Sequence, residues 1–264
     1  MTALSDVLAK CKADGRAALI GYLPVGYPSV EVSITAMRAM VDGGCDVIEV
    51  GVPYSDPIMD GPTIQAAVEP AVRAGVGLKD AFAAVAGVVE AGGAAVVMTY
   101  WNPVERYGVS RFAASLAQAG GSGAITPDLI PDEAAAWLEA SDVEHLDRIF
   151  LVAPSSTDKR IIVTAAQSRG FVYAAALMGV TGARASVSDA AAALVGRVRA
   201  LAPDAAVCVG LGVSSGSQAG EIAAFADGVI VGSAFVRCLL DSPDEAGINA
   251  VRALAAELAG GVRR

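Results

Sequence analysis

Residues 46–65 read DVIEVGVPYSDPIMDGPTIQ and combine an apolar run with two carboxylates that lie close together in sequence. The run DVIEVG (46–51) is typical of a β-strand covered on both faces, yet it contains Glu49. Three prolines and a glycine follow before or beside Asp60, which indicates a loop. The stretch therefore predicts a buried parallel strand and, directly after it, a loop that carries a second acid.

Short apolar runs alternate with longer helical segments along the rest of the chain. The predicted strands are AALIGYL (17–23), DVIEVG (46–51), AAVVMTY (94–100), GAITPD (123–128), RIFLVA (148–153), FVYAAA (171–176), AAVCVGLG (205–212) and DGVIVG (227–232). The predicted helices include SVEVSITAMRAMVDGG (29–44), LKDAFAAVAGVVEAGG (78–93) and SRFAASLAQAGG (110–121). Each of these three segments ends at a pair of glycines, a common helix stop.

Eight strand–helix repeats favour an α/β fold, namely a single eight-stranded parallel (β/α)8 TIM barrel over residues 1–264. An extra N-terminal helix (2–13) and extra helices in the connections after the second and eighth strands complete this prediction. The alternative is an open doubly wound sheet, whose G-x-G-x-x-G fingerprint should follow the first strand. The sequence there is LPVGYPS, which lacks that fingerprint.

Composition excludes several classes of partner. The net charge is −9 and there is no basic cluster, so neither nucleic acid nor an anionic membrane surface is an expected partner. No apolar stretch is long enough to span a membrane, and the N-terminus carries charges where a signal peptide needs an apolar run. Four scattered cysteines and a single histidine, His145, predict a cytoplasmic protein without a disulfide framework or a metal site.

Glu49 is the first candidate for chemistry, because catalytic groups of such barrels lie at the C-terminal ends of strands. Period-two alternation places Val47, Glu49 and Gly51 on one face of the strand. If that face points into the barrel, desolvation should raise the pKa of Glu49 enough for proton exchange near neutrality. The alternative is a structural carboxylate paired with an Arg or Lys.

The sequence allows two interpretations of Asp60 and two of each of several loops. Asp60 in DGP marks a turn or an N-cap with Pro62 in the first helical turn, and Asp56 has the same status. GLGVSS (210–215) and VGSAF (231–235) fit either tight turns or a phosphate site after the last two strands. GVTGAR (179–184) fits a mobile lid or an ordinary loop. The aromatic residues near strand ends fit pocket walls or packing; they are Tyr22, Tyr100, Trp101 and Tyr173.

The stretch VIEVGVPYSDPIMDGPTIQ (47–65) resembles the signature of the tryptophan synthase α subunit family. The loop sequences YLPVGYP, TYWNP, PDLIPDE, GVTGAR, GLGVSS and VGSAF fall where that family has its active-site loops, so the resemblance covers essentially the whole chain. It implies a barrel that cleaves indole-3-glycerol phosphate into indole and glyceraldehyde 3-phosphate. It also implies a β subunit partner in an α2β2 complex, with pyridoxal phosphate in that partner and no cofactor in this chain.

The resemblance also implies roles for individual residues. Glu49 and Asp60 would be the two catalytic carboxylates. The expected substrate-binding residues are Tyr22, Tyr100, Leu151, Tyr173, Thr181, Gly182, Gly212, Gly232 and Ser233, with Thr126–Pro127 close by. Asp56 and Thr181 would lie in the loops that face the partner.

This chain departs from the family pattern at two places. Ile58-Met59 stands where Leu-Ala is common, and Pro127 stands where a small residue is frequent. These departures predict altered packing of the loop before Asp60 and a stiffer pocket wall. Three other functions remain open: another phosphate-binding barrel with a catalytic Lys, a regulatory subunit with little activity, and a lyase without a partner.

Overall fold

The computed structural model describes residues 3–175, 187–210 and 212–263. The strands are β1 (Ala18–Pro24), β2 (Val47–Gly51), β3 (Ala94–Met98), β4 (Gly123–Ile125), β5 (Asp147–Ile149), β6 (Leu151–Val152), β7 (Val172–Ala175), β8 (Val207–Gly210) and β9 (Gly228–Val231). The helices are α1 (Ala3–Ala13), α2 (Val30–Gly43), α3 (Pro62–Arg73), α4 (Leu78–Glu90), α5 (Trp101–Tyr107), α6 (Val109–Gln118), α7 (Ala135–Val143), α8 (Asp158–Gln167), α9 (Val187–Leu201), α10 (Gly216–Ala223), α11 (Ser233–Asp241) and α12 (Glu245–Val262), with a short 3₁₀ helix at Pro131–Glu133.

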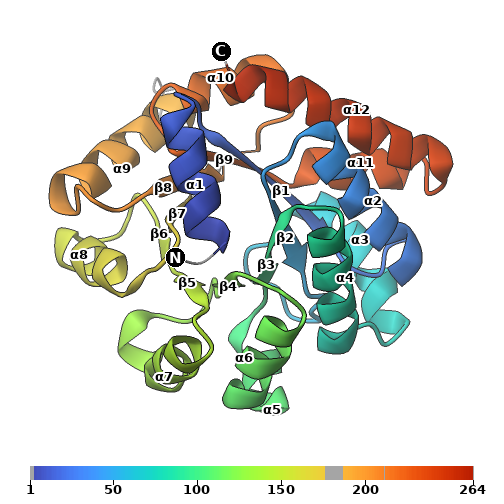
Figure 1. Cartoon of the computed structure of the whole chain (residues 1–264), viewed down its shortest axis with the longest axis horizontal. Coiled ribbons are helices and arrows are strands. Elements are labelled where there is room, and N and C mark those ends of the chain that lie inside the picture. The colour runs from blue at the N-terminus through green and yellow to red at the C-terminus, as the bar shows by residue number, and fades with distance from the viewer. Residues whose placement is uncertain (1–2, 176–186, 211, 264) are drawn as a thin grey trace.

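The strands form one parallel sheet in the order β5-β4-β3-β2-β1-β9-β8-β7-β6. Its two edge strands, β5 and β6, are separated along the chain only by Phe150, so the sheet is a nearly closed barrel (Figure 1). The order runs around the barrel without a reversal, so the doubly wound alternative is wrong.

The described residues form nine strands where eight are predicted, because the predicted strand 148–153 is divided at Phe150 into β5 and β6. Residues Asp147–Ile149 pair with β4, whereas Leu151–Val152 pair with β7. The carbonyl of Phe150 still accepts a hydrogen bond from the backbone N–H of Tyr173, 3.0 Å away. One short segment thus serves both edges of the sheet by changing its pairing partner at Phe150.

The apolar residues divide between the inside and the outside of the barrel. Ile48 and Val50 point outward into the layer between the strands and the surrounding helices, where Phe112 and Trp137 are also fully buried. Val47 belongs to a separate inner cluster with Ile20, Val96 and Phe171. This alternation confirms that Val47 and Glu49 share the inward face of β2 and explains why the strand is apolar on both faces.

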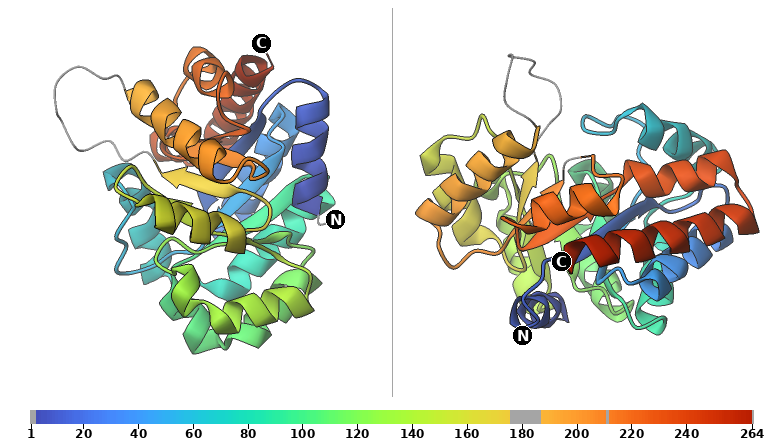
Figure 2. Two further views of the ribbon diagram at one scale, coloured as in Figure 1. Left: turned by 90° about the vertical axis from the view of Figure 1, so that its left-hand side faces the viewer. Right: turned by 90° about the horizontal axis from the view of Figure 1, so that it is seen from above.

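Helix α1 covers the N-terminal end of the barrel. Leu4, Leu8 and Cys11 of α1 pack against the inner cluster. Figure 2 (right) shows α1 at one end of the molecule and α3, which follows β2, at the other. The C-terminal ends of the strands therefore open on the side away from α1.

A capping serine begins helix α2, and the predicted glycine stop ends it. Ser29 is the N-cap of α2 and accepts a hydrogen bond from the N–H of Val32, 3.2 Å away. Gly44 ends this helix with a φ of 107°, a left-handed conformation that favours glycine. The predicted segment 29–44 therefore corresponds to α2, and the segments 78–93 and 110–121 correspond to α4 and α6.

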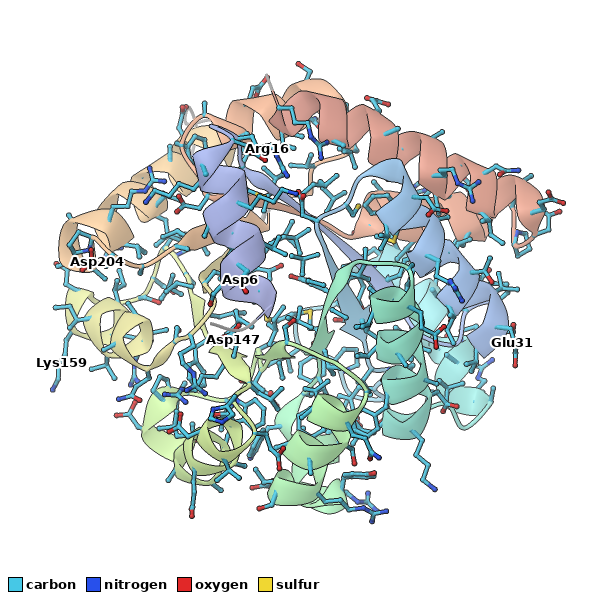
Figure 3. All side chains as sticks on the ribbon, viewed as in Figure 1. Asp6, Arg16, Glu31, Asp147, Lys159 and Asp204 are labelled. Carbon is cyan, nitrogen blue, oxygen red and sulfur yellow. The ribbon has the colours of Figure 1, made fainter. Side chains whose placement is uncertain are left out.

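An ion pair between Arg16 and Asp46 joins the segments just before the first two strands, at the N-terminal end of the barrel. Figure 3 labels Arg16. The guanidinium of Arg16 donates to both carboxylate oxygens of Asp46, at 2.8 and 2.9 Å, and both side chains are about nine-tenths buried. Asp46 also accepts from the N–H of Leu19, 2.9 Å away. The acid just before β2 is thus structural, which distinguishes it from Glu49 three residues later.

In the part of the chain that the structure describes, no helix is both long and apolar enough to cross a membrane. The same residues contain no group of three or more His, Cys, Asp or Glu side chains arranged to hold a metal ion.

Candidate active site

A cavity of about 320 Å³ opens at the C-terminal end of the barrel. It is lined by Tyr22, Glu49, Met59, Asp60, Gly61, Ile64, Met98, Tyr173, Ala175, Gly210, Gly212, Ile230, Gly232 and Ser233. Seven of the residues predicted for the site are in this set, and they come from β1, β2, β7 and the loops after β2, β8 and β9. Glu49 and Asp60 therefore line the same open cavity.

Glu49 lies on the inner face of β2, opposite Tyr22 of β1 in the sheet register. Its side chain is 1% exposed, and neither carboxylate oxygen has a hydrogen-bond partner among the described residues. Burial raises the pKa of Glu49 from an ordinary 4.5 to about 8. Among the described residues no Arg or Lys pairs with Glu49 in the way that Arg16 pairs with Asp46.

Two tyrosines border Glu49, and two glycines make room for them. A methyl group on Gly51 would lie 2.5 Å from the hydroxyl oxygen of Tyr22, and one on Gly210 would come at least as close to that of Tyr173. Such separations are far below van der Waals contact. The glycines at the ends of β2 and β8 thus allow the side chains of Tyr22 and Tyr173 to lie close against these strands beside the cavity.

Asp60 reaches the cavity from the loop between β2 and α3. The N-cap of α3 is Gly61, with Pro62 in the first turn, so the interpretation of Asp60 as the N-cap is wrong. The carboxylate of Asp60 is left available for the cavity. Burial raises its pKa, and a hydrogen bond donated by the hydroxyl of Tyr100 lowers it in part.

The opposite wall is built from small residues at the ends of β8 and β9. Gly212 has a φ of 67°, which favours glycine, and a methyl group added there would meet nothing within 4 Å. Gly232 is the N-cap of α11 and Ser233 is its first residue. The first N–H groups of a nine-residue helix therefore lie at the cavity, an arrangement that attracts an anion.

The remaining predicted residues take different positions. Tyr100 is absent from the lining of this cavity but borders a separate small pocket together with Tyr22, Asp60 and Pro127. Leu151 packs against the inner cluster and is also absent from the cavity lining. Asp56 is exposed in the loop after β2. Thr181 and Gly182, with the rest of 179–184, lie outside the described residues. His145 is exposed, as predicted for a surface residue.

Several residues that line the cavity are not among the predicted site residues. Met98 and Ile230 lie on the inward faces of β3 and β9, where alternation could have located them, but their side chains carry no chemical signal. Met59 lines the cavity, while its neighbour Ile58 is 73% exposed. The two residues of the unusual Ile58-Met59 pair thus point in different directions.

The arrangement suits the transfer of a proton and the binding of a phosphate ester. Glu49 is buried and mostly protonated at neutral pH because its pKa is raised, so it can give a proton to a bound molecule. Asp60 is better placed to stabilise a positive charge on a bound molecule, because the hydrogen bond from Tyr100 favours the anionic form of its carboxylate. The N-terminus of α11 offers backbone N–H groups to an anionic group.

Comparison with known proteins agrees with this geometry. A family model described as "Tryptophan synthase alpha chain" matches residues 8–261. The tryptophan synthase alpha chain of Thermobifida fusca (strain YX) is 60% identical over 266 residues, covering 100% of this chain and 98% of that protein. That of Mycobacterium tuberculosis (strain ATCC 25618 / H37Rv) is 62% identical over 260 residues, covering 98% and 94%.

Solved structures give the same result. A crystal structure of tryptophan synthase from M. tuberculosis, in an open form with BRD0059 bound, superposes with a TM-score of 0.91 at 59% identity and covers 99% of this chain and 98% of that one. The tryptophan synthase subunit alpha of Legionella pneumophila str. Paris has a TM-score of 0.89 at 28% identity, with coverage of 99% and 98%. The chain therefore belongs to the tryptophan synthase alpha chain family.

Proposed function

We propose that this chain is the α subunit of a tryptophan synthase and cleaves indole-3-glycerol phosphate into indole and glyceraldehyde 3-phosphate. One observation carries the proposal beyond family membership: a protonated Glu49 and a hydrogen-bonded Asp60 face the same cavity. The reaction is a retro-aldol cleavage that needs one group to move protons and another to hold a charge.

Glu49 is the proposed proton shuttle. Its carboxylic acid protonates C3 of the indole ring, which turns the ring into an electron acceptor. The resulting carboxylate takes the proton from the hydroxyl group on the carbon next to the ring. As that carbon becomes the aldehyde, the electrons of the broken C–C bond return to the ring, and Glu49 ends as it began. The raised pKa of Glu49 suits both transfers near neutral pH.

Asp60 is the proposed group that stabilises the intermediate. Protonation at C3 leaves a positive charge at the ring nitrogen, and the Asp60 carboxylate accepts a hydrogen bond from that N–H. The phosphate rests at the N-terminus of α11, on the backbone N–H groups of Gly232 and Ser233, with Gly212 beside it. Tyr22 and Tyr100 flank the ring, and Leu151, Tyr173, Thr181 and Gly182 keep the substrate-binding roles that the resemblance implies.

The proposed partner is a β subunit in an α2β2 complex. Pyridoxal phosphate belongs to that subunit, which joins indole to serine, and this chain supplies no cofactor because the indole ring itself accepts the electrons. Asp56, which is exposed, and Thr181 are the proposed contacts with the partner. We also propose a single cytoplasmic domain over residues 1–264, with β5 and β6 acting as one strand of an eight-stranded barrel.

A second enzyme class fits less well. An isomerase or indole-glycerol-phosphate synthase of this fold needs a catalytic lysine at a strand end. The four lysines of the sequence, Lys10, Lys12, Lys79 and Lys159, all lie in helices, and the described lining of the cavity contains none. A regulatory subunit would not need both Glu49 and Asp60 in the cavity.

The test is a steady-state assay of indole release with and without a β subunit. Glu49→Gln should abolish turnover, and Asp60→Asn should lower kcat by roughly 10²-fold or more, by analogy with the loss of one preorganised electrostatic group. Glu139→Gln changes an exposed carboxylate on α7 and is the matched control. Near-normal turnover by Glu49→Gln would overturn the shuttle role, and full activity without the β subunit would indicate a free-standing lyase.

A further inference from the structure

The hydroxyl of Tyr100 holds three consecutive residues of the loop after β2. It accepts hydrogen bonds from the backbone N–H groups of Ile58 and Met59, at 3.1 and 3.0 Å, and lies 3.3 Å from Oδ1 of Asp60. Since both N–H groups can only donate, the single hydrogen of the hydroxyl is directed to the Asp60 carboxylate. The donor and acceptor capacity of the hydroxyl is thereby fully used.

Tyr100 is itself fixed to the barrel wall. It follows β3 closely and is the N-cap of α5, and the N–H of Trp101 donates to both carboxylate oxygens of Asp128, at 2.9 and 3.1 Å. The N–H of Thr99 donates to the carbonyl of Ile125 at the end of β4, 3.1 Å away. The base of the Tyr100 side chain therefore belongs to the rigid part of the molecule.

The ring of Tyr100 has little freedom. It is 6% exposed and packs against the ring of Tyr54 with centroids 5.1 Å apart. The loop, by contrast, has few other attachments: among the described residues, the N–H groups of Ile58 and Met59 have the Tyr100 hydroxyl as their hydrogen-bond partner. A rigid side chain thus sets the position of a loop that carries Asp60.

We propose that Tyr100 is a positioning residue, which holds the Asp60 carboxylate in place for the cleavage step by a hydrogen bond from its hydroxyl. This inference rests on the proposed function, because it assigns a task to Tyr100 through Asp60. It differs from the role as a wall of the indole pocket, for which the ring alone would be enough. The two bonds to the loop use backbone N–H groups, so this role does not depend on the side chains of the unusual Ile58-Met59 pair.

The direct test is Tyr100→Phe in the complex with the β subunit, which keeps the ring and removes the hydroxyl. We expect kcat to fall roughly 10- to 100-fold with a smaller change in KM, because a displaced catalytic group mainly affects the transition state. The acid limb of the kcat profile should move to higher pH, because the pKa of Asp60 rises when it loses the hydrogen bond that favours its anion. Tyr107→Phe removes a hydroxyl that contacts Ser115, and it should leave both parameters unchanged.

A double-mutant cycle separates positioning from general damage to the fold. If Tyr100 acts through Asp60, Asp60→Asn with Tyr100→Phe should be about as slow as Asp60→Asn alone. Additive losses, an effect confined to KM, or an unchanged acid limb would each overturn the inference. Wild type and Asp60→Asn measured in parallel keep the two proposals apart. Failure of wild type to release indole refutes the proposed function, whereas an active wild type with an unaffected Tyr100→Phe refutes only the role of Tyr100.

Discussion

Glu49→Gln should make the protein more stable at neutral and alkaline pH while it removes the proposed activity. In the unfolded chain a glutamate releases its proton near its ordinary pKa of 4.5, whereas folded Glu49 keeps its proton until about pH 8. Between these values the folded state binds one more proton than the unfolded state, so this group makes stability fall as pH rises. At 1.36 kcal/mol per pKa unit, the difference between 4.5 and 8 lowers the free energy of unfolding by about 5 kcal/mol once Glu49 is ionised in both states.

The neutral amide of the variant avoids this cost. We expect Glu49→Gln and wild type to have similar free energies of unfolding well below pH 4.5, where the glutamate of wild type is largely protonated in both states. The advantage of the variant should then grow to about 3 kcal/mol at pH 7 and reach its limit above pH 8. Urea unfolding of the isolated subunit, followed by circular dichroism at several pH values, measures this difference.

The control is Glu139→Gln, which alters an exposed carboxylate. Its free energy of unfolding should follow that of wild type across the same pH range. Equal pH dependence of wild type and Glu49→Gln would refute the reasoning, because it would mean that Glu49 is ionised in the folded protein. In that case the acid could not begin the reaction as a proton donor.

Three other predictions concern the site and the base of the barrel. The alkaline limb of kcat/KM should lie near pH 8, where Glu49 loses its proton; a profile that stays flat to about pH 10 would exclude Glu49 as the donor. Gly210→Ala should push the Tyr173 hydroxyl, which the new methyl group would overlap, into the cavity and raise KM roughly tenfold. Its control is Gly196→Ala, where the methyl group meets nothing within 4 Å. Arg16→Met should cost about 3–5 kcal/mol in denaturant unfolding by leaving buried Asp46 without its partner, against about 0–1 kcal/mol for the same change at the exposed Arg252.

Periodicity is enough to locate most of the fold. Runs of apolar residues mark the strands because parallel strands are covered on both faces, and glycine pairs mark the helix ends because φ turns positive there. The exception is the segment 148–153, where the pairing partner changes at Phe150. That change depends on how the sheet closes, which involves residues far away in sequence and leaves no local pattern.

For the site, too, local pattern locates some residues and fails for others. Alternation along β2 is sufficient to place Glu49 on the same face as Val47, because successive side chains of a strand point to opposite faces. Local pattern fails for Asp60: DGP suggests a capping aspartate, whereas Gly61 is the N-cap and Asp60 bonds to Tyr100, forty residues away. A hydrogen bond between a loop and the end of a neighbouring strand has no signature in either segment alone.

The burial of Glu49 also bears on how an acidic protein binds an anionic substrate. The chain carries a net charge of −9, and two ionised acids in one cavity would repel a phosphate ester further. Because the pKa of Glu49 is about 8, Glu49 adds little negative charge to the cavity at neutral pH. The desolvation that suits Glu49 to its proposed role as proton donor therefore also lowers the repulsion of the substrate. Above about pH 8 Glu49 loses its proton, so it can no longer donate one and its charge repels the substrate. Binding and turnover should therefore weaken over the same pH range.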